Sequence, residues 1–243
     1  MGRGQGDARG GAMRLVVKTG ERVMWVWVED GAGEPVGGVR AAISLAAAGD
    51  MGTGIEGTPA REVWCREVGV GKVRCVRQVH GRRVVDAGEA GVEADGLVAQ
   101  EVVCGVTVAD CVPVWAWRMD GGVWGVAHSG WRGTGIAGEL VRRLGGEGVV
   151  AVVGPSIRAC CYRVDEERAR WFERAWGEGA VVWREEGPYL DLAAVNRRLC
   201  REAGARVFVV DACTACDTRF GSFRREGTHF THMLAIIGKI AHL

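Results

Sequence analysis

The stretch from Val106 to Gly138 reads VTVADCVPVWAWRMDGGVWGVAHSGWRGTGIAG, and it decides what fold the rest of the chain has to support. Two apolar runs, Val112–Trp117 and Val123–Ala127, are rich in β-branched and aromatic residues. The turn-forming sequence Asp-Gly-Gly at 120–122 separates them. Apolar runs joined by such a turn predict a hairpin of buried strands. Glycines follow the second run, and a helix is expected over Gly135–Leu144.

Reactive side chains stand where the apolar runs of this stretch stop. Cys111 follows the run that ends at Ala109, and His128 follows the run that ends at Ala127. Strand ends are places where a rigid framework meets solvent, and sites are often assembled there. We therefore expect Cys111 and His128 to belong to a functional site.

The composition indicates a globular protein that acts on small molecules. With 243 residues and 48% hydrophobic content, the chain can bury a large core, and we expect a single domain over residues 13–243. Its 31 basic and 30 acidic side chains give a formal charge of +1. No global field would therefore draw it to nucleic acid or to an anionic membrane. The composition predicts no particular oligomeric state.

The cysteine content and the start of the chain indicate a cytoplasmic protein. Nine cysteines are an odd number and are spread along the chain, which is typical of reduced thiols in a cytosolic protein. The first twelve residues, MGRGQGDARGGA, are rich in glycine and charge, so we expect a disordered tail over 1–12. No uncharged apolar run reaches the length of about 18 residues that a membrane-spanning helix needs.

Strands outnumber helices in the predicted pattern, and hairpins alternate with helical crossovers. This combination favours an α+β fold in which mixed β-sheet layers are flanked by helices. Besides the hairpin, the expected strands are Val23–Val28, Val73–Val79, Val102–Ala109, Val149–Val153, Val207–Val210 and Met233–Ile240. Besides Gly135–Leu144, the expected helices are Pro59–Val68, Asp165–Trp176 and Asp191–Ala203.

Three potential metal ligands, His80, Cys111 and His128, each follow an expected apolar strand. Two imidazoles and a thiolate form a ligand set that suits Zn²⁺. Three protein ligands leave a fourth position for water, whose pKa zinc would lower toward neutrality. Hydroxide would then be available for attack on a carbonyl carbon or on an amidine-like ring carbon.

The same residues support two other interpretations. Cys111 could act as a thiolate nucleophile, with His128 or His80 as its base and Asp110 as the group that orients the base. Alternatively, the histidines would be structural hydrogen-bonding groups and Cys111 a small buried residue. Metal analysis separates these alternatives, because bound zinc converts the thiolate from nucleophile to ligand.

Two glycine patterns match GxGxxG, at Gly52–Gly57 and at Gly133–Gly138. No clear strand and helix flank the first, so its spacing is attributed to chance in a chain with 39 glycines. The second begins a helix, but residues 128–132 separate it from the preceding strand, which argues against a dinucleotide site. Its amides at a helix N-terminus could still hold an anion such as phosphate.

Two further groups of side chains near the C-terminus have alternative readings. Cys213 and Cys216 form a CxxC pair, which is half of a metal site at most, and a structural or incidental role is favoured. Arg219, Arg224 and Arg225 surround Ser222. These arginines form either a solvated loop or an anion clamp, for which the guanidinium group is well suited.

Several blocks of this sequence, in their order along the chain, resemble those of the YfiH-like family. The blocks are RQVHG (77–81), ADG (94–96), TVADCVPV (107–114), AHSGWRGT (127–134), GPSI with CCY (154–157 and 160–162), LDL (190–192), CTACD (213–217) and SFRREG (222–227). The family has been labelled laccase-domain or polyphenol oxidase, purine nucleoside phosphorylase and peptidoglycan editing factor.

The resemblance implies an α+β fold shared with certain toxin deamidases and a zinc ion held by His80, Cys111 and His128. It also implies action on purine nucleosides. The reactions would be phosphorolysis of adenosine, inosine, guanosine or methylthioadenosine and hydrolytic deamination of adenosine. Zinc hydroxide would attack C6 of adenosine while Asp110 or another nearby acid manages protons, and Arg132, Arg224 or the glycine amides after Trp131 would hold phosphate. The residues expected to bind substrate are Gln78, Arg132, Ser222, Arg224 and Arg225.

The chain departs from the family pattern at Ala46, Gly221 and His232, where Asn, Phe and Arg are usual. Two other functions stay open, the second of them because of these departures. One is hydrolysis of amide bonds in a peptidoglycan precursor, by zinc-activated water or by a Cys-His pair. The other is a non-catalytic nucleoside-binding regulator. A conventional multicopper laccase is excluded, because its coppers need about ten histidines. This chain has five histidines.

Overall fold

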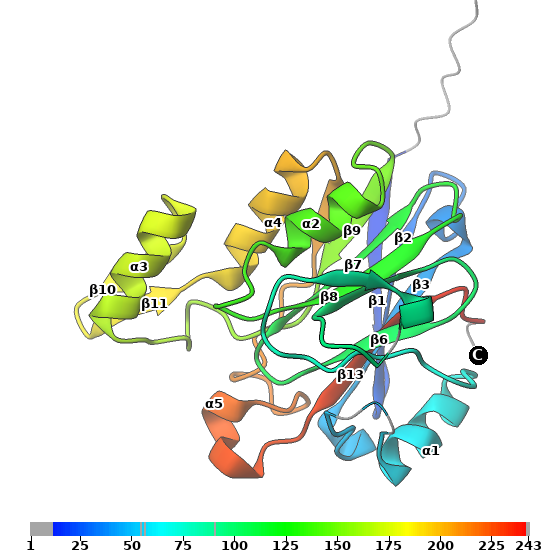
Figure 1. Ribbon diagram of the computed structural model, residues 1–243. Coiled ribbons are helices and arrows are strands. Elements are labelled where there is room, and N and C mark those ends of the chain that lie inside the picture. Colours follow the sequence, from blue (N-terminus) through cyan, green and yellow to red (C-terminus); the bar gives the residue numbers. More distant parts are fainter. Residues whose placement is uncertain (1–11, 54, 56, 90, 242–243) are drawn as a thin grey trace, which may run out of the picture.

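The computed structural model describes residues 12–53, 55, 57–89 and 91–241 (Figure 1). The tail expected over 1–12 lies outside this part of the chain, except for Ala12. Two β-sheets form the body of the protein, with helices on their outer faces. A two-stranded ribbon, β10 (Val181–Arg184) with β11 (Gly187–Leu190), packs against helix α3 (Glu166–Trp176) at one end.

The first sheet has five strands in the order β1-β2-β3-β13-β6, and every neighbouring pair is antiparallel. It joins the start of the described chain to its end, since β13 lies between β3 and β6. Its strands are β1 (Arg14–Thr19), β2 (Val23–Glu29), β3 (Arg40–Ser44), β6 (Cys104–Val108) and β13 (Met233–Gly238).

The second sheet has six strands in the order β12-β9-β7-β8-β5-β4. The pairs at its two edges, β12 with β9 and β4 with β5, are parallel, while the central pairs are antiparallel. Its strands are β4 (Val84–Asp86), β5 (Gly96–Ala99), β7 (Val112–Arg118), β8 (Trp124–Ser129), β9 (Val149–Val153) and β12 (Arg206–Val209). The expected mixed α+β fold is confirmed by this arrangement.

Alternation along the strands divides the core into layers. In β2, Val26 packs between the two sheets, whereas Trp25 and Trp27 point to the outer face. Trp64 of helix α1 (Pro59–Glu67) packs in the same outer cluster as those two tryptophans. Successive side chains of a strand point to opposite faces, so a strand buried on both sides is apolar at every position.

Helices α2 and α4 cover the six-stranded sheet, and α3 and α5 extend the molecule to one side (Figure 1). Helices α2 and α4 contact each other and pack on the face of this sheet that points away from the five-stranded sheet. None of the described helices is long and apolar enough to cross a membrane. The helices that follow α1 are α2 (Ile136–Arg143), α3 (Glu166–Trp176), α4 (Leu192–Glu202) and α5 (Phe223–Glu226). The 3-10 helices are Val36–Gly38, Ala46–Ala48, Ala87–Glu89 and Gly227–His229.

The predicted hairpin is confirmed, and its register explains how the ends of the two strands meet. Pro113 is paired with His128 and Val112 with Ser129. The residue that precedes β7 therefore lies beside the last residues of β8. One detail was wrong, because His128 belongs to the strand itself rather than following it.

The strand predicted over 73–79 was also wrong. Arg74 makes an isolated bridge to Cys104 of the five-stranded sheet, and Arg77 makes one to Glu93, close to the start of β5 in the other sheet. The chain passes here from one sheet toward the other, so it pairs with each at a single residue and cannot form a continuous ladder. His80 consequently lies in a loop and not at the end of a strand.

Candidate active site

Three separate segments bring His80, Cys111 and His128 together. His80 comes from the loop before β4, Cys111 from the turn between β6 and β7, and His128 from the end of β8. Their possible ligand atoms, two imidazole nitrogens and one sulfur, all lie within 4.8 Å of one another. The two imidazole rings are nearly perpendicular, at 87°, with centroids 4.7 Å apart. One metal ion could be reached by all three side chains.

His128 is held in the orientation that metal binding needs. Its ring is 3% exposed, and Nδ1 lies 2.9 Å from Oδ1 of Asp95. A carboxylate accepts here, so Nδ1 carries a hydrogen and Nε2 is the nitrogen that would bind a metal ion. A carboxylate behind a metal-binding histidine is the usual means of fixing its ring and its tautomer.

Asp95 also fixes the loop that carries His80. Its carboxylate accepts hydrogen bonds from the backbone N–H groups of Val79, His80 and Gly81, at 3.2, 2.9 and 2.7 Å. Burial acts to raise the pKa of Asp95, but the bonds from His128, Gly81 and Val79 outweigh it and lower the pKa below its usual value. One buried carboxylate therefore supports two of the three candidate ligands.

The backbone is strained at two residues of this site. Among the described non-glycine residues, His80 and Asp110 alone have positive φ angles, of 60° and 81°. Side chains disfavour this region, and such strain persists only where the surroundings impose it, often at functional sites. At His80, the three N–H bonds to Asp95 supply that constraint.

The charges around Cys111 favour its thiolate form. Burial acts to raise the pKa of this thiol, but His128 and His80 lower it to about 6. Burial acts to lower the pKa of His128, and Cys111 and Asp95 raise it to about 9. A thiolate is the form that binds zinc and also the form that acts as a nucleophile. The charges therefore fit Cys111 both as a metal ligand and as a nucleophile, whereas the convergence of three donors favours a metal.

Glycines leave room for these side chains. A Cβ atom on Gly130 would lie 3.0 Å from Sγ of Cys111 and 3.3 Å from Cδ2 of His80. On Gly133 it would lie 2.5 Å from the carbonyl oxygen of Gly81. Gly133, the first glycine of the second GxGxxG pattern, thus allows two loops to pack closely. No residue of Gly133–Gly138 lines the cavity described next.

A cavity of about 450 Å³ opens above the three candidate ligands. Its size lies within the range of small-molecule sites. Aromatic side chains and arginines make up much of its wall. The lining residues include Gln78, His80, Asp110, Cys111, His128, Trp131, Arg132, Tyr162, Arg168, Phe223, Arg224, Phe230 and His232.

Asp110 is the one carboxylate among the described residues that line this cavity. One of its oxygens accepts a bond from the hydroxyl of Thr214 at 2.7 Å, and the other accepts one from the backbone N–H of Arg224 at 2.7 Å. Its own carbonyl oxygen accepts from the N–H of Ile157 at 2.9 Å. These bonds fix the carboxylate beside Cys111 and connect it to two distant loops.

Three arginines line the cavity. The guanidinium carbons of Arg132 and Arg168 lie 4.8 and 4.7 Å from the ring centre of Trp131, within cation–π range. The guanidinium carbon of Arg224 lies 5.4 Å from the ring centre of Tyr162. Two of these arginines belong to the predicted substrate-binding set. Arg168 was not predicted, because a basic residue in the first turns of a helix resembles an ordinary surface residue.

The other predicted substrate-binding residues have structural contacts. Gln78 lines the cavity, but its amide makes three hydrogen bonds to Thr107, at 2.8, 2.7 and 3.0 Å. Ser222 caps α5 by accepting the N–H of Arg225. Arg225 donates to the carbonyl oxygens of Thr214 and Ala215. Ser222 and Arg225 thus lie outside the cavity lining and stabilise the loop that carries Arg224.

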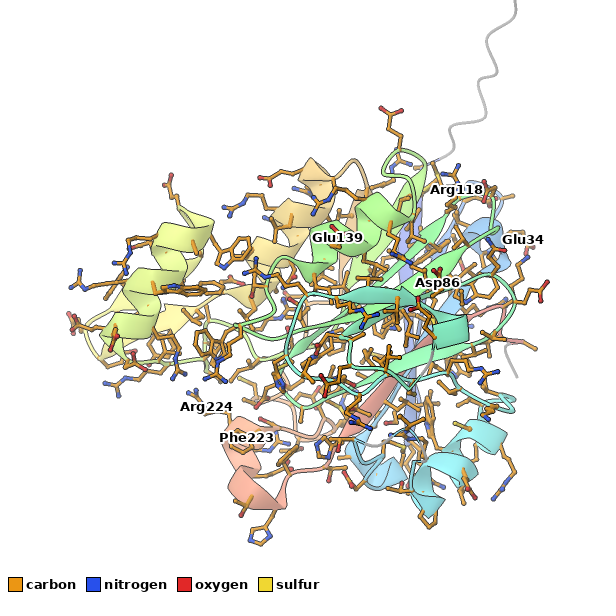
Figure 2. The ribbon with its side chains drawn as sticks, in the orientation of Figure 1. Glu34, Asp86, Arg118, Glu139, Phe223 and Arg224 are labelled. Carbon is orange, nitrogen blue, oxygen red and sulfur yellow. The ribbon has the colours of Figure 1, made fainter. Side chains whose placement is uncertain are left out.

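Aromatic residues that were not predicted as site residues form one wall. Phe223, which lies beside Arg224 on helix α5 (Figure 2), meets Phe230 edge to face, with ring centres 5.3 Å apart at 85°. The side chain of Phe223 is 55% exposed even though it lines the cavity. An exposed phenylalanine beside a site can stack on a flat ring. Its position within SFRREG, next to the predicted Arg224, was the signal available in the sequence.

The three departures from the family pattern lie in different local surroundings. A Cβ atom on Gly221 would lie 1.9 Å from the carbonyl oxygen of Thr231, so the close approach of these two segments requires glycine here. His232 lines the cavity, and its Nδ1 lies 3.0 Å from Oδ1 of Asp50. The N–H of Ala46 donates to the carbonyl oxygen of Arg219. At Ala46 the contact involves the backbone alone.

Residues 49–239 match the family model described as multi-copper polyphenol oxidoreductase laccase. The chain belongs to this family. The purine nucleoside phosphorylase YlmD of Geobacillus stearothermophilus is 33% identical over 74% of this chain and 72% of its own length. A purine nucleoside phosphorylase of Deinococcus radiodurans is 38% identical over 67% of this chain and 68% of its own. The adenosine deaminase RL5, of an unknown prokaryotic organism, is 34% identical over 62% and 69%.

Solved structures of the family share this fold. YlmD of Geobacillus stearothermophilus superposes with a TM-score of 0.77 at 28% identity, over 94% of this chain and all of that one. The hypothetical protein YfiH of Bacillus licheniformis gives 0.72 at 26% identity, over 82% and 92%. The resemblance to YfiH-like proteins is thereby confirmed. The description of the family refers to several coppers, for which five histidines in the whole chain are too few.

Proposed function

We propose that this protein is a zinc-dependent enzyme of purine nucleosides, which carries out their phosphorolysis and the hydrolytic deamination of adenosine. The observation that carries the proposal is the convergence of His80, Cys111 and His128 beneath a cavity walled by aromatic and arginine side chains. Support also comes from three relatives, two named purine nucleoside phosphorylase and one named adenosine deaminase.

Zinc suits the three candidate ligands better than a hard cation does. One thiolate and two imidazoles are borderline to soft donors, and Mg²⁺ or Ca²⁺ prefers oxygen ligands instead. A zinc ion bound there supplies a Lewis acid and water with a pKa near neutrality. Asp95 fits this role as well, since it orients His128 and the loop of His80.

The aromatic wall is suited to hold the purine base. Phe223, Phe230 and Tyr162 line the same cavity, and bases stack readily on such rings. Stacking would hold the base against this wall, and the carboxylate of Asp110 and the candidate ligands line the same cavity. The cavity has room for a nucleoside together with a small anion.

In the deamination, the amino group on C6 of adenosine is replaced by oxygen from water, and ammonia leaves. The reaction needs a group that takes a proton from water and returns one to the departing nitrogen. We assign this transfer to the carboxylate of Asp110, which Thr214 and Arg224 hold in place by hydrogen bonds.

In the phosphorolysis, an oxygen of phosphate replaces the base at the ribose carbon. Arg132, Arg168 and Arg224 line the cavity and offer planar sets of donors to an anion. Arg224 is held in part, because its Nη1 donates to the carbonyl oxygen of Cys161 at 3.0 Å. We assign phosphate binding to these arginines.

The test is to incubate zinc-loaded protein with adenosine, with and without phosphate, and to separate the products by chromatography. Adenine in the presence of phosphate and inosine without it are expected. A zinc-loaded wild type that forms neither would refute the proposal. Hydrolysis that survives complete metal removal and disappears in Cys111→Ala would instead assign the chemistry to a thiol nucleophile.

A further inference from the structure

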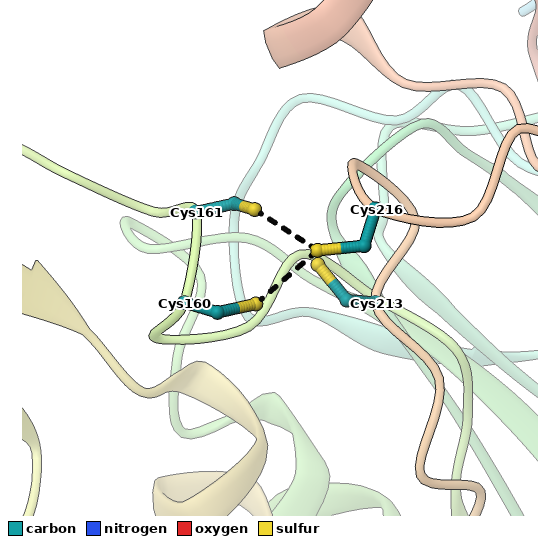
Figure 3. Close-up of side chains that lie close together, drawn as sticks. All are labelled: Cys160, Cys161, Cys213 and Cys216. Atoms are coloured by element: carbon teal, nitrogen blue, oxygen red, sulfur yellow. Dashed lines mark hydrogen bonds between the residues drawn. The ribbon is translucent and has the colours of Figure 1, made fainter.

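Four cysteines outside the candidate active site form a second cluster (Figure 3). Sγ of Cys216 lies 3.3 Å from Sγ of Cys161 and 3.6 Å from Sγ of Cys160. The sulfur of Cys213 completes a group of four atoms that all lie within 4.8 Å of one another. All four are free thiols.

The topology of the six-stranded sheet brings the two halves of this cluster together. Cys160 and Cys161 lie in the loop after β9, and Cys213 and Cys216 lie in the loop after β12. Because β9 and β12 are parallel neighbours, their carboxyl ends lie at the same edge of the sheet. A further bridge between Ser156 and Cys213 continues this pairing into the loops.

The sulfur positions match a single tetrahedral ion. A Zn–S bond of about 2.3 Å places tetrahedral sulfurs about 3.8 Å apart. The two measured separations, 3.3 and 3.6 Å, are slightly shorter and allow the small expansion that an ion would require. Clusters of several irons bind sulfurs through different iron atoms, which need wider spacing than 4.8 Å allows for all four.

A positive group lies beside the cluster. The half-buried side chain of Arg158 donates to the carbonyl oxygens of Val210 and Ala212, just before Cys213. Cysteine ligands release their protons when a divalent cation binds.

We propose that Cys160, Cys161, Cys213 and Cys216 bind one structural zinc ion, which joins the loops after β9 and β12. Four thiolate ligands fill a tetrahedral zinc site and leave no position for water. The ion is therefore separate in place and in role from a zinc ion at His80, Cys111 and His128.

This zinc site would support the wall of the substrate cavity. Tyr162, which lines the cavity, directly follows Cys161, and Thr214, which binds Asp110, directly follows Cys213. Arg224 donates to the carbonyl oxygen of Cys161. One ion would thus fix three contacts of the cavity without contacting a substrate.

The test removes the other candidate ligands and measures zinc. The variant His80→Ala/Cys111→Ser/His128→Ala, purified under reducing conditions, is expected to keep one equivalent of zinc by elemental analysis. X-ray absorption at the zinc edge should show four sulfur neighbours at about 2.3 Å. No bound zinc, iron in its place, or a disulfide between Cys161 and Cys216 would overturn the proposal.

A second measurement uses the otherwise intact chain, so that the result does not depend on folding of the triple variant. Cys213→Ser/Cys216→Ser should contain one equivalent of zinc less than the wild type, whatever the wild-type total is. Cys65→Ala is the control, because this buried cysteine belongs to helix α1 and should leave the zinc content unchanged. Equal zinc in the double variant and the wild type would contradict the site. Neither measurement requires nucleoside turnover. The zinc contents can therefore be interpreted even if the proposed function is refuted.

Discussion

The carboxylate of Asp95 lies 2.9 Å from Nδ1 of His128, and both side chains are buried. The same carboxylate accepts three backbone N–H groups of the loop that carries His80. Two candidate ligands from different parts of the chain therefore share one support. Their mutual geometry depends on Asp95 as much as on the strands.

Asp95→Asn is expected to weaken zinc binding at the candidate active site by roughly ten- to a hundredfold, because metal ligands depend on such supports. The amide keeps the size of the side chain but loses the charge, and its NH₂ group faces hydrogen-bond donors. Competition with a chromophoric chelator measures the affinity. Asp120→Asn, at the exposed hairpin turn, is the control. Equal affinities in both variants would show that Asp95 is not needed.

Gly130→Ala is expected to disrupt the same centre by steric overlap. Its Cβ would lie 3.0 Å from Sγ of Cys111, so a ligand has to move. We expect a loss of roughly tenfold or more in zinc affinity, the scale seen when ligand supports are disturbed. Gly88→Ala is the matched control, because a Cβ there meets no atom within 4 Å. Wild-type affinity in Gly130→Ala would argue against zinc coordination by Cys111.

Phe223→Ala is expected to raise KM for nucleosides roughly ten- to a hundredfold, since stacking contributes about 1–3 kcal/mol per base. The thermal midpoint should change little, because the side chain is 55% exposed. Steady-state kinetics and thermal unfolding together check both statements. Trp183→Ala is the control, because it removes another exposed aromatic residue, on β10 and away from the cavity. An unchanged KM in Phe223→Ala would remove the phenylalanine from base binding.

Arg132→Gln is expected to separate the two proposed reactions. A charged hydrogen bond contributes about 1.5–3 kcal/mol, so KM for phosphate should rise roughly ten- to a hundredfold. Deamination without phosphate should be nearly unchanged. Arg174→Gln, at the exposed end of α3, serves as the control. Equal losses in both reactions of Arg132→Gln would assign Arg132 a structural role instead of phosphate binding.

Local patterns predicted the central hairpin, one consequence of its register and three of the helices. The apolar runs on either side of Asp120-Gly121-Gly122 have the pattern of strands, and a single turn joins them. Antiparallel pairing of the two strands then places Cys111 near His128. The helices over α2, α3 and α4 follow from amphipathic spacing and, for two of them, from Asp165 and Asp191 as N-caps. These features depend on interactions between residues close in sequence.

Features that depend on tertiary distances were missed. Asp95 is part of a short motif, but its role arises from N–H groups in another loop. Arg168 reaches the cavity because α3 packs beside Trp131. The CxxC pair was interpreted as half a metal site at most, because Cys160 and Cys161 come from a loop on a different strand. No local pattern in the sequence indicates that residues so far apart along the chain lie close together in the fold.

The central claim is that nucleoside turnover depends on a zinc ion held by His80, Cys111 and His128. The most direct measurement is adenosine turnover in wild-type protein that is stripped of metal and then titrated with zinc, in parallel with His128→Ala. We predict that turnover returns as zinc is added to the wild type and stays absent in the variant. Turnover that is indifferent to zinc, or equal in the two proteins, would contradict the account.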